Sequence, residues 1–432
     1  MSDGRRIDIQ VPVLARVEGE GALELAARDG HIETLKLRIF EPPRLFEKFL
    51  EGRDCHEVPD LVARICGICP VAYQMSAVQA LESLFGVEPG PWVRAMRRAM
   101  YCGEWIESHA LHIHLLAAPD FLGYPNAIAM AKDHPEVVRR GLRLQALGND
   151  LIRLFGGRSV HPVGVCVGGF HRAPAPDEVA ALRARLTEAL GEAEELLAWS
   201  ARLPLPASDQ DFICVALRDP GEYPMYAGRI VAGDGLDINA AGFEREFREF
   251  QVPHSTALHS LYRGRPYLVG PLARLHLNRD RLPPPVQAAL VATGIMFPTR
   301  NMYHSIVARA AELLLAVHEA LRLLSDYAPA PQARVSVPVR AGVGFGVSEA
   351  PRGLLWHRYE VDAAGLVRAA RIVPPTSQNQ ARIEQDLRQS LEEYGLAHGD
   401  AELRLRAETV IRNYDPCISC ATHFLDLRVE RT

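Results

Sequence analysis

The sequence predicts a mainly helical α+β fold, in which a bundle of long helices forms the core and small antiparallel β-sheets lie beside it. Long stretches repeat apolar residues at helical spacing, above all residues 73–155, 176–203 and 285–327. Shorter stretches near both ends alternate apolar and polar residues, as half-buried strands do. No internal repeat, low-complexity tract or long Pro/Gly/Ser linker divides the 432 residues, so we expect one domain over residues 1–432.

The first half of the chain should begin with a short antiparallel sheet at residues 7–40, where alternating runs are separated by glycine-containing turns. A helical stretch follows two prolines, in RLFEKFLEGR (44–53). The long helical region that comes next should be interrupted at several points, one of them at Pro119. The segment 156–172 is rich in glycine and β-branched residues, which indicates an irregular and closely packed loop.

The second half predicts short strands and loops at 204–280, where glycine, proline and aromatic residues are frequent. A helical region follows, and residues 335–375 then have the alternation and the glycine-containing turns of a β-hairpin region. Two last helices, at about 380–396 and 400–413, should lead into a cysteine motif near the end of the chain.

Composition excludes several classes of protein. The chain has 48 Lys+Arg against 53 Asp+Glu, and its hydrophobic fraction of 48% is that of an ordinary globular protein rather than a disordered or multi-span membrane chain. Charges of both signs are interspersed, so the basic surface expected of a nucleic-acid-binding protein is missing. The first residues lack an apolar signal segment, and no stretch approaches ~18 uncharged apolar residues. We therefore expect a cytoplasmic protein with no membrane span.

The cysteines form two groups. In a long chain without a signal segment they should be reduced, so that clustered cysteines are candidates for metal or redox sites rather than disulfides. Four of them form two CxxC pairs near opposite ends of the chain: Cys66, Cys69, Cys417 and Cys420. The others stand singly and are expected to be buried structural thiols: Cys55, Cys102, Cys166 and Cys214.

Two CxxC pairs supply four soft sulfur ligands. Such a set suits zinc, an iron–sulfur cluster, or a thiolate-bound nickel or iron centre. A structural Zn(Cys)4 knot is one alternative, although zinc ribbons usually place their two pairs within ~15–20 residues. If both pairs share one site, the fold must bring the two ends of the chain together.

The residues around the pairs are more specific than their spacing. The chain reads RICGICP at 64–70 and DPCISCATH at 415–423, and this combination resembles the large, catalytic subunit of [NiFe] hydrogenases. Further stretches across the whole chain fit the same resemblance: RVEG (16–19), RLFEKFLEGRD (44–54), ESHALHIHLLAAPDF (107–121), GGRSVHP (156–162), EAPRG (349–353) and VPPTSQN (373–379). GICPVAYQMSA and the CATH ending are most similar to the cytoplasmic, multisubunit branch of the family, which is NAD(P)-linked or sulfhydrogenase-like.

The resemblance implies a nickel–iron centre that carries CO and cyanide ligands and cleaves H2 heterolytically and reversibly. By this resemblance Cys66 and Cys417 are terminal nickel ligands. Cys69 and Cys420, the second cysteine of each pair, bridge nickel to iron. Thiolates are suitable ligands because they are soft donors.

The resemblance also assigns residues around the metals. Glu18 is the expected proton relay beside a nickel thiolate, Arg352 the guanidinium above the open coordination position, and Asp120 the carboxylate that holds this arginine. Four residues are expected to line the CO and cyanide ligands: Pro351, Val373, Pro374 and Thr376.

A magnesium ion is a second implied cofactor. Glu47 and His423 are its expected side-chain ligands, and the backbone carbonyl of Arg371 is the expected third contact. Oxygen and nitrogen ligands, with retained water molecules, are what such an ion prefers.

Four histidines and one glutamine are further candidates for metal binding or proton transfer, but the sequence supports these roles less well. His109, His112 and His114 lack the H-x-x-x-H spacing of a zinc site, which favours core histidines over metal ligands. We expect His161 to be structural as well. Gln79 stands where relatives tend to have histidine, which leaves any proton-path role of that position open.

The chain carries no nucleotide-binding glycine motif in a Rossmann context and no further cysteine cluster. Electrons should therefore leave through a small iron–sulfur subunit and continue to flavin- and NAD(P)-binding subunits. The resemblance also implies a maturation protease that removes residues 424–432 as a C-terminal extension. Two alternatives remain at this point: a non-catalytic homologue such as the quinone-site subunit of complex I, which lacks the four cysteines, and a structural zinc protein.

Overall fold

The computed structural model describes residues 6–422, and the chain begins there with a three-stranded antiparallel sheet. Strands β1 (Arg6–Val11), β2 (Gly21–Arg28) and β3 (His31–Ile39) pair in the order β1-β2-β3. Alternate residues of β1 are buried, which is the pattern that a sheet with one solvated face requires. The predicted sheet at 7–40 is confirmed.

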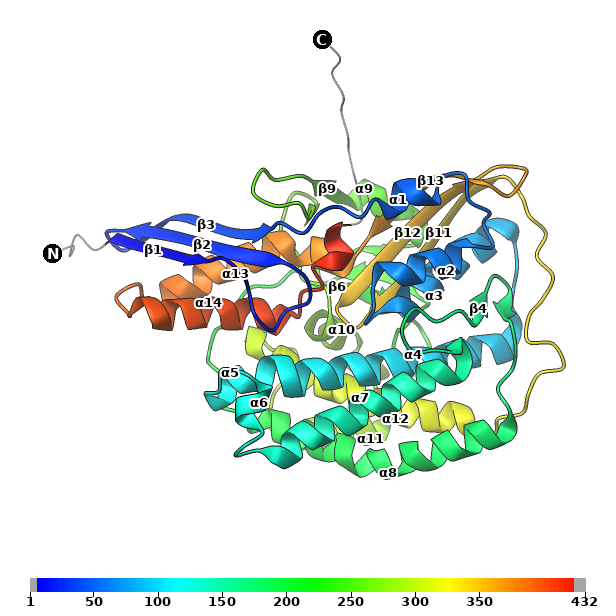
Figure 1. The fold of residues 1–432 in the computed structure, drawn as a ribbon, viewed down its shortest axis with the longest axis horizontal. Coiled ribbons are helices and arrows are strands. Elements are labelled where there is room, and N and C mark those ends of the chain that lie inside the picture. Colours follow the sequence, from blue (N-terminus) through cyan, green and yellow to red (C-terminus); the bar gives the residue numbers. More distant parts are fainter. Residues whose placement is uncertain (1–5, 423–432) are drawn as a thin grey trace, which may run out of the picture.

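Long helices form the core of the molecule. They are α3 (Pro70–Phe85), α4 (Gly90–Leu111), α7 (Pro135–Gly156), α8 (Pro176–Ala201) and α12 (Ser305–Ser325). Helix α4 packs against both α7 and α12, and α12 also packs against α8, so that these four run side by side (Figure 1). Their shared faces are mainly apolar, and this burial of helix stripes is the main stabilising contribution to the bundle.

The helix at residues 90–122 does not break where the sequence predicts. Helix α4 continues through a π-helical turn, η2 (His112–Ala117), into α5 (Ala118–Leu122). Pro119 lies directly after the π-helical turn, where the altered hydrogen-bond ladder accommodates a residue without an N–H group. The helix ends at Gly123, whose φ of 78° is in the left-handed region that favours glycine.

A second antiparallel sheet contains β11 (Gly342–Ala350), β12 (Gly353–Val361) and β13 (Val367–Val373), in that order. Helix α3 packs directly against β11. Gly346 makes this approach possible, because a Cβ at that position would lie 1.9 Å from the carbonyl oxygen of Ser76. The hairpin region predicted at 335–375 is confirmed, with its first strand beginning at Gly342.

The remaining elements connect these parts. They are α1 (Phe46–Leu50), α2 (Val58–Val62), η1 (Ala63–Ile65), α6 (Ala127–Met130), β4 (Val165–Cys166), β5 (Gly169–Phe170), β6 (Val215–Arg218), β7 (Arg229–Ala232), β8 (Asp237–Ile238), η3 (Ala240–Gly242), α9 (Phe243–Glu246), β9 (Phe247–Phe250), β10 (His259–Tyr262), α10 (Pro271–Asn278), η4 (Arg279–Arg281), α11 (Pro284–Ala292), η5 (Met302–His304), α13 (Pro375–Tyr394), α14 (Asp400–Tyr414) and η6 (Ser419–Thr422). The region 204–280 contains the expected short strands, but α10 was not predicted.

Segments from the N-terminal and C-terminal parts of the described chain meet. In Figure 1 the last described turn lies between the sheets, next to α13 and the segment that leads from β3 to α1. The amide of Arg44 donates to the carbonyl of Thr422 at 2.7 Å, and the amide of Ile418 donates to the carbonyl of Glu18 at 3.0 Å. One main apolar core reaches from β1 to the final turn.

Within residues 6–422, none of the helices combines the length and the hydropathy that crossing a bilayer requires. His423 and the predicted extension at 424–432 lie outside the described residues.

Candidate metal centre

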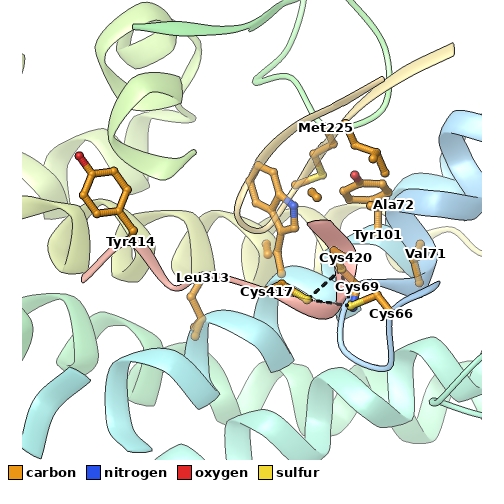
Figure 2. Packing of buried hydrophobic residues seen from close by; sticks show 14 of the residues in the cluster. Cys66, Cys69, Val71, Ala72, Tyr101, Met225, Leu313, Tyr414, Cys417 and Cys420 are labelled. Atoms are coloured by element: carbon orange, nitrogen blue, oxygen red, sulfur yellow. Dashed lines mark hydrogen bonds between the residues drawn. The ribbon is translucent and has the colours of Figure 1, made fainter. Parts of the chain in front are cut away.

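Four cysteine sulfur atoms from opposite ends of the chain converge in the core. The Sγ atoms of Cys66 and Cys417 lie 3.6 Å apart, and those of Cys69 and Cys420 lie 3.7 Å apart. Within each pair the Sγ atoms are 2.7 and 2.8 Å apart. All four residues are buried, and Figure 2 shows the two pairs facing each other from separate segments. The structure therefore brings both cysteine motifs to one place, as the sequence predicts.

Local sequence explains how each pair is presented. Cys69 directly precedes α3, and Pro70 begins that helix. The amides of Ile68 and Cys69 turn inward and donate to Cys66 Sγ at 3.3 and 3.0 Å. At the other end, Asp415 ends α14 in the left-handed conformation with φ of 55°, which redirects the chain into the second motif.

Glu104 fixes the start of α3 immediately behind Cys69. Its carboxylate accepts hydrogen bonds from the amides of Val71 and Ala72 at 2.6 and 3.1 Å, at the positive end of the helix dipole. Burial raises its pKa well above the ordinary value. The sequence analysis did not identify this residue.

The electrostatics of the four thiols favour metal binding. Burial would raise the pKa of Cys66, but hydrogen bonds from the other three thiols and the charge of Arg352 hold it well below the usual thiol value. Burial raises the pKa of Cys69 and of Cys420. A metal cation that replaces the remaining thiol protons would bind all four sulfur atoms in this buried space. The donor set therefore fits a soft or borderline metal.

Glu18 lies directly against the second motif. Its Oε2 accepts from Cys417 Sγ and from the amide of Ser419, both at 3.1 Å, and its Oε1 accepts from the Ser419 hydroxyl at 2.5 Å. The next residue must be small, because a Cβ at Gly19 would lie 2.7 Å from Cβ of Ile418. Gly19 also has φ of 87°, which favours glycine. The RVEG motif therefore places a carboxylate on a candidate metal ligand.

Arg44 connects the two cysteine motifs. Its guanidinium donates to the carbonyl of Ile65 at 2.6 Å and to the carbonyl of Ser419. Ile65 directly precedes the first CxxC pair and Ser419 lies within the second, so one side chain links both segments. The sequence analysis did not single out Arg44, although it begins the RLFEKFLEGRD stretch.

Arg352 lies at the tip of the β11–β12 hairpin and is only 2% exposed. Its Nε donates to the carbonyl of Asp415 at 2.7 Å, and a terminal nitrogen donates to the Asp415 carboxylate at 3.1 Å. Burial opposes its charge, but Asp415 and the cysteine thiolates keep its pKa well above the usual value. A permanent positive charge thus faces the thiolates.

The prediction that Asp120 holds Arg352 is wrong. Asp120 lies in α5 and pairs with Arg412 of α14 at 2.6 and 2.9 Å, and also with Arg16. Asp415, which begins the second motif, is the carboxylate on Arg352. The prediction failed because Asp120 was taken from a resemblance of sequence, whereas the contact depends on how α14 ends.

A buried charge network supports the tip that carries Arg352. Arg274 of α10 donates to the backbone carbonyls of Ala350 and Pro351 at 2.8 and 3.0 Å. The same guanidinium pairs with Glu312 at 2.7 Å and Glu349 at 2.9 Å, and the side chains of all three charged residues are 0% exposed. The network fixes the backbone on which Arg352 stands.

The residues expected near the CO and cyanide ligands surround the same space. Val373, Pro374 and Thr376 are buried where β13 passes into α13. The Thr376 hydroxyl oxygen accepts the amide of Cys417 at 3.0 Å. Pro351 is buried next to Arg352, so these residues lie on segments that flank the sulfur atoms.

The predicted magnesium ligands are partly brought together. Glu47 Oε1 accepts the amide of Ile372 at 2.7 Å. Arg371 directly precedes Ile372 on β13, so the predicted backbone contact lies on the strand that Glu47 touches. The carbonyl of Arg371 as a magnesium contact stays a prediction.

The core interpretation of the three histidines is confirmed. Each is buried and has a hydrogen-bond partner: Glu312 for His109, the Arg412 carbonyl for His112 and the Ala110 carbonyl for His114. Burial lowers the pKa of His109 to about 4 and that of His112 to about 3. Neutral imidazoles of this kind complete the packing of the core.

His161 and Gln79 have structural contacts too. The His161 ring lies 2.8 Å from the carbonyl of Ala63, and the Gln79 amide donates to the carbonyl of Tyr226 at 2.8 Å. Three of the four single cysteines, Cys55, Cys102 and Cys214, are buried as predicted, while Cys166 is half-buried.

The fold and the site together define a metalloprotein with a buried four-thiolate centre, and the comparisons with other proteins agree. The profile of the nickel-dependent hydrogenase family matches residues 44–139 and 259–423. Sulfhydrogenase 1 subunit alpha of Pyrococcus furiosus is 33% identical over 98% of this chain and 99% of its own length. The NAD-reducing hydrogenase HoxS subunit beta of Cupriavidus necator is 28% identical over 95% and 94% of the two chains.

Solved structures give the same result. The crystal structure of an NAD+-reducing [NiFe]-hydrogenase in the H2-reduced state superposes with a TM-score of 0.87 at 29% identity, covering 96% of this chain and 99% of that one. The chain therefore belongs to the nickel-dependent hydrogenase family, as the catalytic large subunit of a [NiFe] hydrogenase. The predicted α+β fold of that subunit is confirmed.

Proposed function

We propose that the four cysteines hold a nickel–iron centre, with Cys66 and Cys417 as terminal nickel ligands and Cys69 and Cys420 as bridging ligands. The convergence of four buried sulfur atoms from the two ends of the chain is the observation that carries this proposal. When bound, such a centre supplies heterolytic cleavage of H2. CO and cyanide ligands on the iron would lie among Pro351, Val373, Pro374 and Thr376.

Glu18 takes the proton in this proposal. Its carboxylate contacts Cys417 Sγ at 3.1 Å, which is within reach for direct proton transfer from sulfur to oxygen. The amide and hydroxyl of Ser419 hold the carboxylate in place. Asp120 has no such contact with the thiols, and we assign it the structural role of joining α5 to α14.

Arg352 supplies a fixed positive charge above the thiolates. We expect Arg352→Lys to lower hydrogen oxidation by roughly 10²–10³-fold, the typical cost of removing a preorganised donor. Lysine lacks the planar fork that binds the carbonyl and the carboxylate of Asp415 at once. The measurement is H2-dependent dye reduction by protein with a determined nickel and iron content.

Arg368→Lys is the matched control, because Arg368 lies on β13 with its side chain 61% exposed. It should retain full activity. Full activity in Arg352→Lys as well would remove the guanidinium from the catalytic machinery.

A magnesium ion is the second cofactor that we propose. Glu47 and the backbone carbonyl of Arg371 would be ligands, together with His423, which lies outside the described residues. Hard oxygen donors beside retained water suit this ion better than a soft metal.

NAD(P) is the proposed terminal electron carrier. The similarity to the HoxS subunit beta and to the NAD+-reducing enzyme supports this carrier, and so do the sequence features that imply partner subunits. The partners are a small iron–sulfur subunit and flavin- and NAD(P)-binding subunits, and the location is the cytoplasm, where these nucleotides are available.

Purification from the native host tests the carrier. We expect iron–sulfur and flavin subunits to accompany the chain and H2 to drive reduction of NAD+ or NADP+. Dye reduction without nucleotide reduction by the intact complex would overturn the carrier and leave the hydrogenase assignment in place. Intact-mass measurement of the nickel-loaded chain also tests the proposed removal of 424–432, since a chain ending at Thr432 would reject it.

A further inference from the structure

A cluster of two histidines and a glutamate lies apart from the cysteine centre. His254 is in the loop between β9 and β10, His259 begins β10, and Glu384 is in the middle of α13. Within 6–422, their nitrogen and oxygen atoms form a group of the kind that holds a metal ion, all within 4.8 Å of one another. Neither the catalytic proposal nor the magnesium proposal uses these residues.

Two of the distances are near those of a tetrahedral metal site. His254 Nε2 forms a hydrogen bond of 2.8 Å with Glu384 Oε1, and His259 Nε2 lies 3.5 Å from Glu384 Oε2. Zinc bonds of about 2.0–2.2 Å place tetrahedral ligand atoms about 3.3 Å apart. Shifts of a few tenths of an ångström would bring these atoms to that spacing.

The burial of His259 and its lack of hydrogen bonds are the second observation that indicates a bound ligand. Its side chain is 2% exposed, and in the part of the chain that the structure describes neither ring nitrogen makes a hydrogen bond. Its Nε2 faces Glu384 Oε2 only at the ion-pair distance of 3.5 Å. A buried imidazole that makes no hydrogen bond is costly, because its polar atoms have lost their water. A metal bound to Nε2 would remove that cost and explain why the ring faces the carboxylate.

The surroundings provide the remaining features of such a site. The amide of Leu37 donates to Glu384 Oε1 at 3.0 Å and orients the carboxylate, as second partners of metal ligands do. His254 lines a surface cavity of about 660 Å³, whose rim includes Arg38 and Gln251. Water in this cavity could supply the fourth ligand.

We propose that His254, His259 and Glu384 bind a divalent transition metal, zinc above all, as a clamp between the β9–β10 loop, β3 and α13. Two imidazoles and one carboxylate are a typical donor set for zinc, whereas magnesium and calcium prefer oxygen alone. The clamp has a connection to the cysteine centre. Thr376 and Glu384 share α13 and lie about 12 Å apart along its axis, so the metal would fix the helix whose first turn contacts Cys417.

The test compares four forms of the full-length protein in its native complex: the wild type, His259→Ala, Glu384→Gln and the control His398→Ala. His398 forms an exposed pair with Glu402 at 3.6 Å, so the control removes a histidine beside a glutamate without touching the cluster. After incubation with zinc and removal of free metal, zinc, nickel and iron are quantified in each form. We expect the wild type and His398→Ala to hold zinc and the two cluster variants to lose it, with nickel and iron unchanged.

Cobalt(II) in place of zinc separates this site from the cysteines. A nitrogen–oxygen site gives weak visible bands, whereas bound thiolates add an intense charge-transfer band in the near ultraviolet. Equal zinc in all four forms, no zinc in the wild type, or a thiolate band from the added cobalt would each overturn the proposal. None of these outcomes affects the hydrogenase proposal, which depends on nickel and iron at the cysteines.

Discussion

Cys417→Ser is expected to abolish hydrogen oxidation by this protein. Cys417 Sγ lies 3.6 Å from Cys66 Sγ and 2.8 Å from Cys420 Sγ, in the middle of the thiol cluster. A serine hydroxyl is a hard donor that does not ionise at neutral pH, so one of the four soft ligands is lost. The measurement is H2-dependent dye reduction by the purified protein, with nickel quantified on the same sample.

Cys102→Ser is the matched control for this variant. Cys102 is fully buried in α4, where its thiol approaches the sulfur of Met225 at 4.0 Å and takes no part in the cluster. The same chemical change there should leave activity and nickel content near those of the wild type. Wild-type activity in Cys417→Ser would contradict the ligand assignment, and a collapse of both variants would indicate loss of the fold instead.

Glu18→Gln should lower proton exchange by about 10²–10⁴-fold while the metals remain bound, the usual range for removing a general acid–base group. Glutamine keeps the shape of the side chain and its carbonyl oxygen can still accept from Ser419, but its amide cannot take the proton of Cys417. The measurement is exchange between H2 and D2O, which reports proton movement independently of the electron carrier.

Glu20→Gln provides the comparison, because Glu20 is exposed two residues further along the same loop. It should exchange at the wild-type rate. Glu18→Asp adds a second comparison, since it keeps a carboxylate but withdraws it from Cys417, and we expect partial activity. Wild-type exchange in Glu18→Gln would remove this residue from the proton path.

The sequence was sufficient for the parts of the site that depend on short motifs. Both CxxC pairs and RVEG are local patterns, and the structure brings them together as expected. The long helices and the sheets β1-β2-β3 and β11-β12-β13 were also predictable, because their apolar periodicity extends over many residues.

The error in the site concerns a contact that depends on the direction of a side chain. Asp120 was assigned to Arg352, but the left-handed turn at Asp415 brings a different carboxylate there. That turn cannot be derived from composition or spacing.

Residues that act on the backbone were missed for a related reason. Arg44, Glu104 and Arg274 each bind backbone groups of segments far away in sequence. An arginine or glutamate in a helical stretch looks like a solvated surface residue until the opposite segment is known. Glu104 and Arg274 are buried and Arg44 is half-buried, and this burial of charged side chains is visible only in the folded chain.

The most direct test of the central proposal is metal analysis combined with infrared spectroscopy on protein purified from its native host. We predict nickel and iron in equal amounts, together with infrared bands from CO and cyanide, and loss of both metals and bands in Cys417→Ser. Zinc at the four cysteines without nickel, and a spectrum without CO or cyanide bands, would contradict the proposed centre.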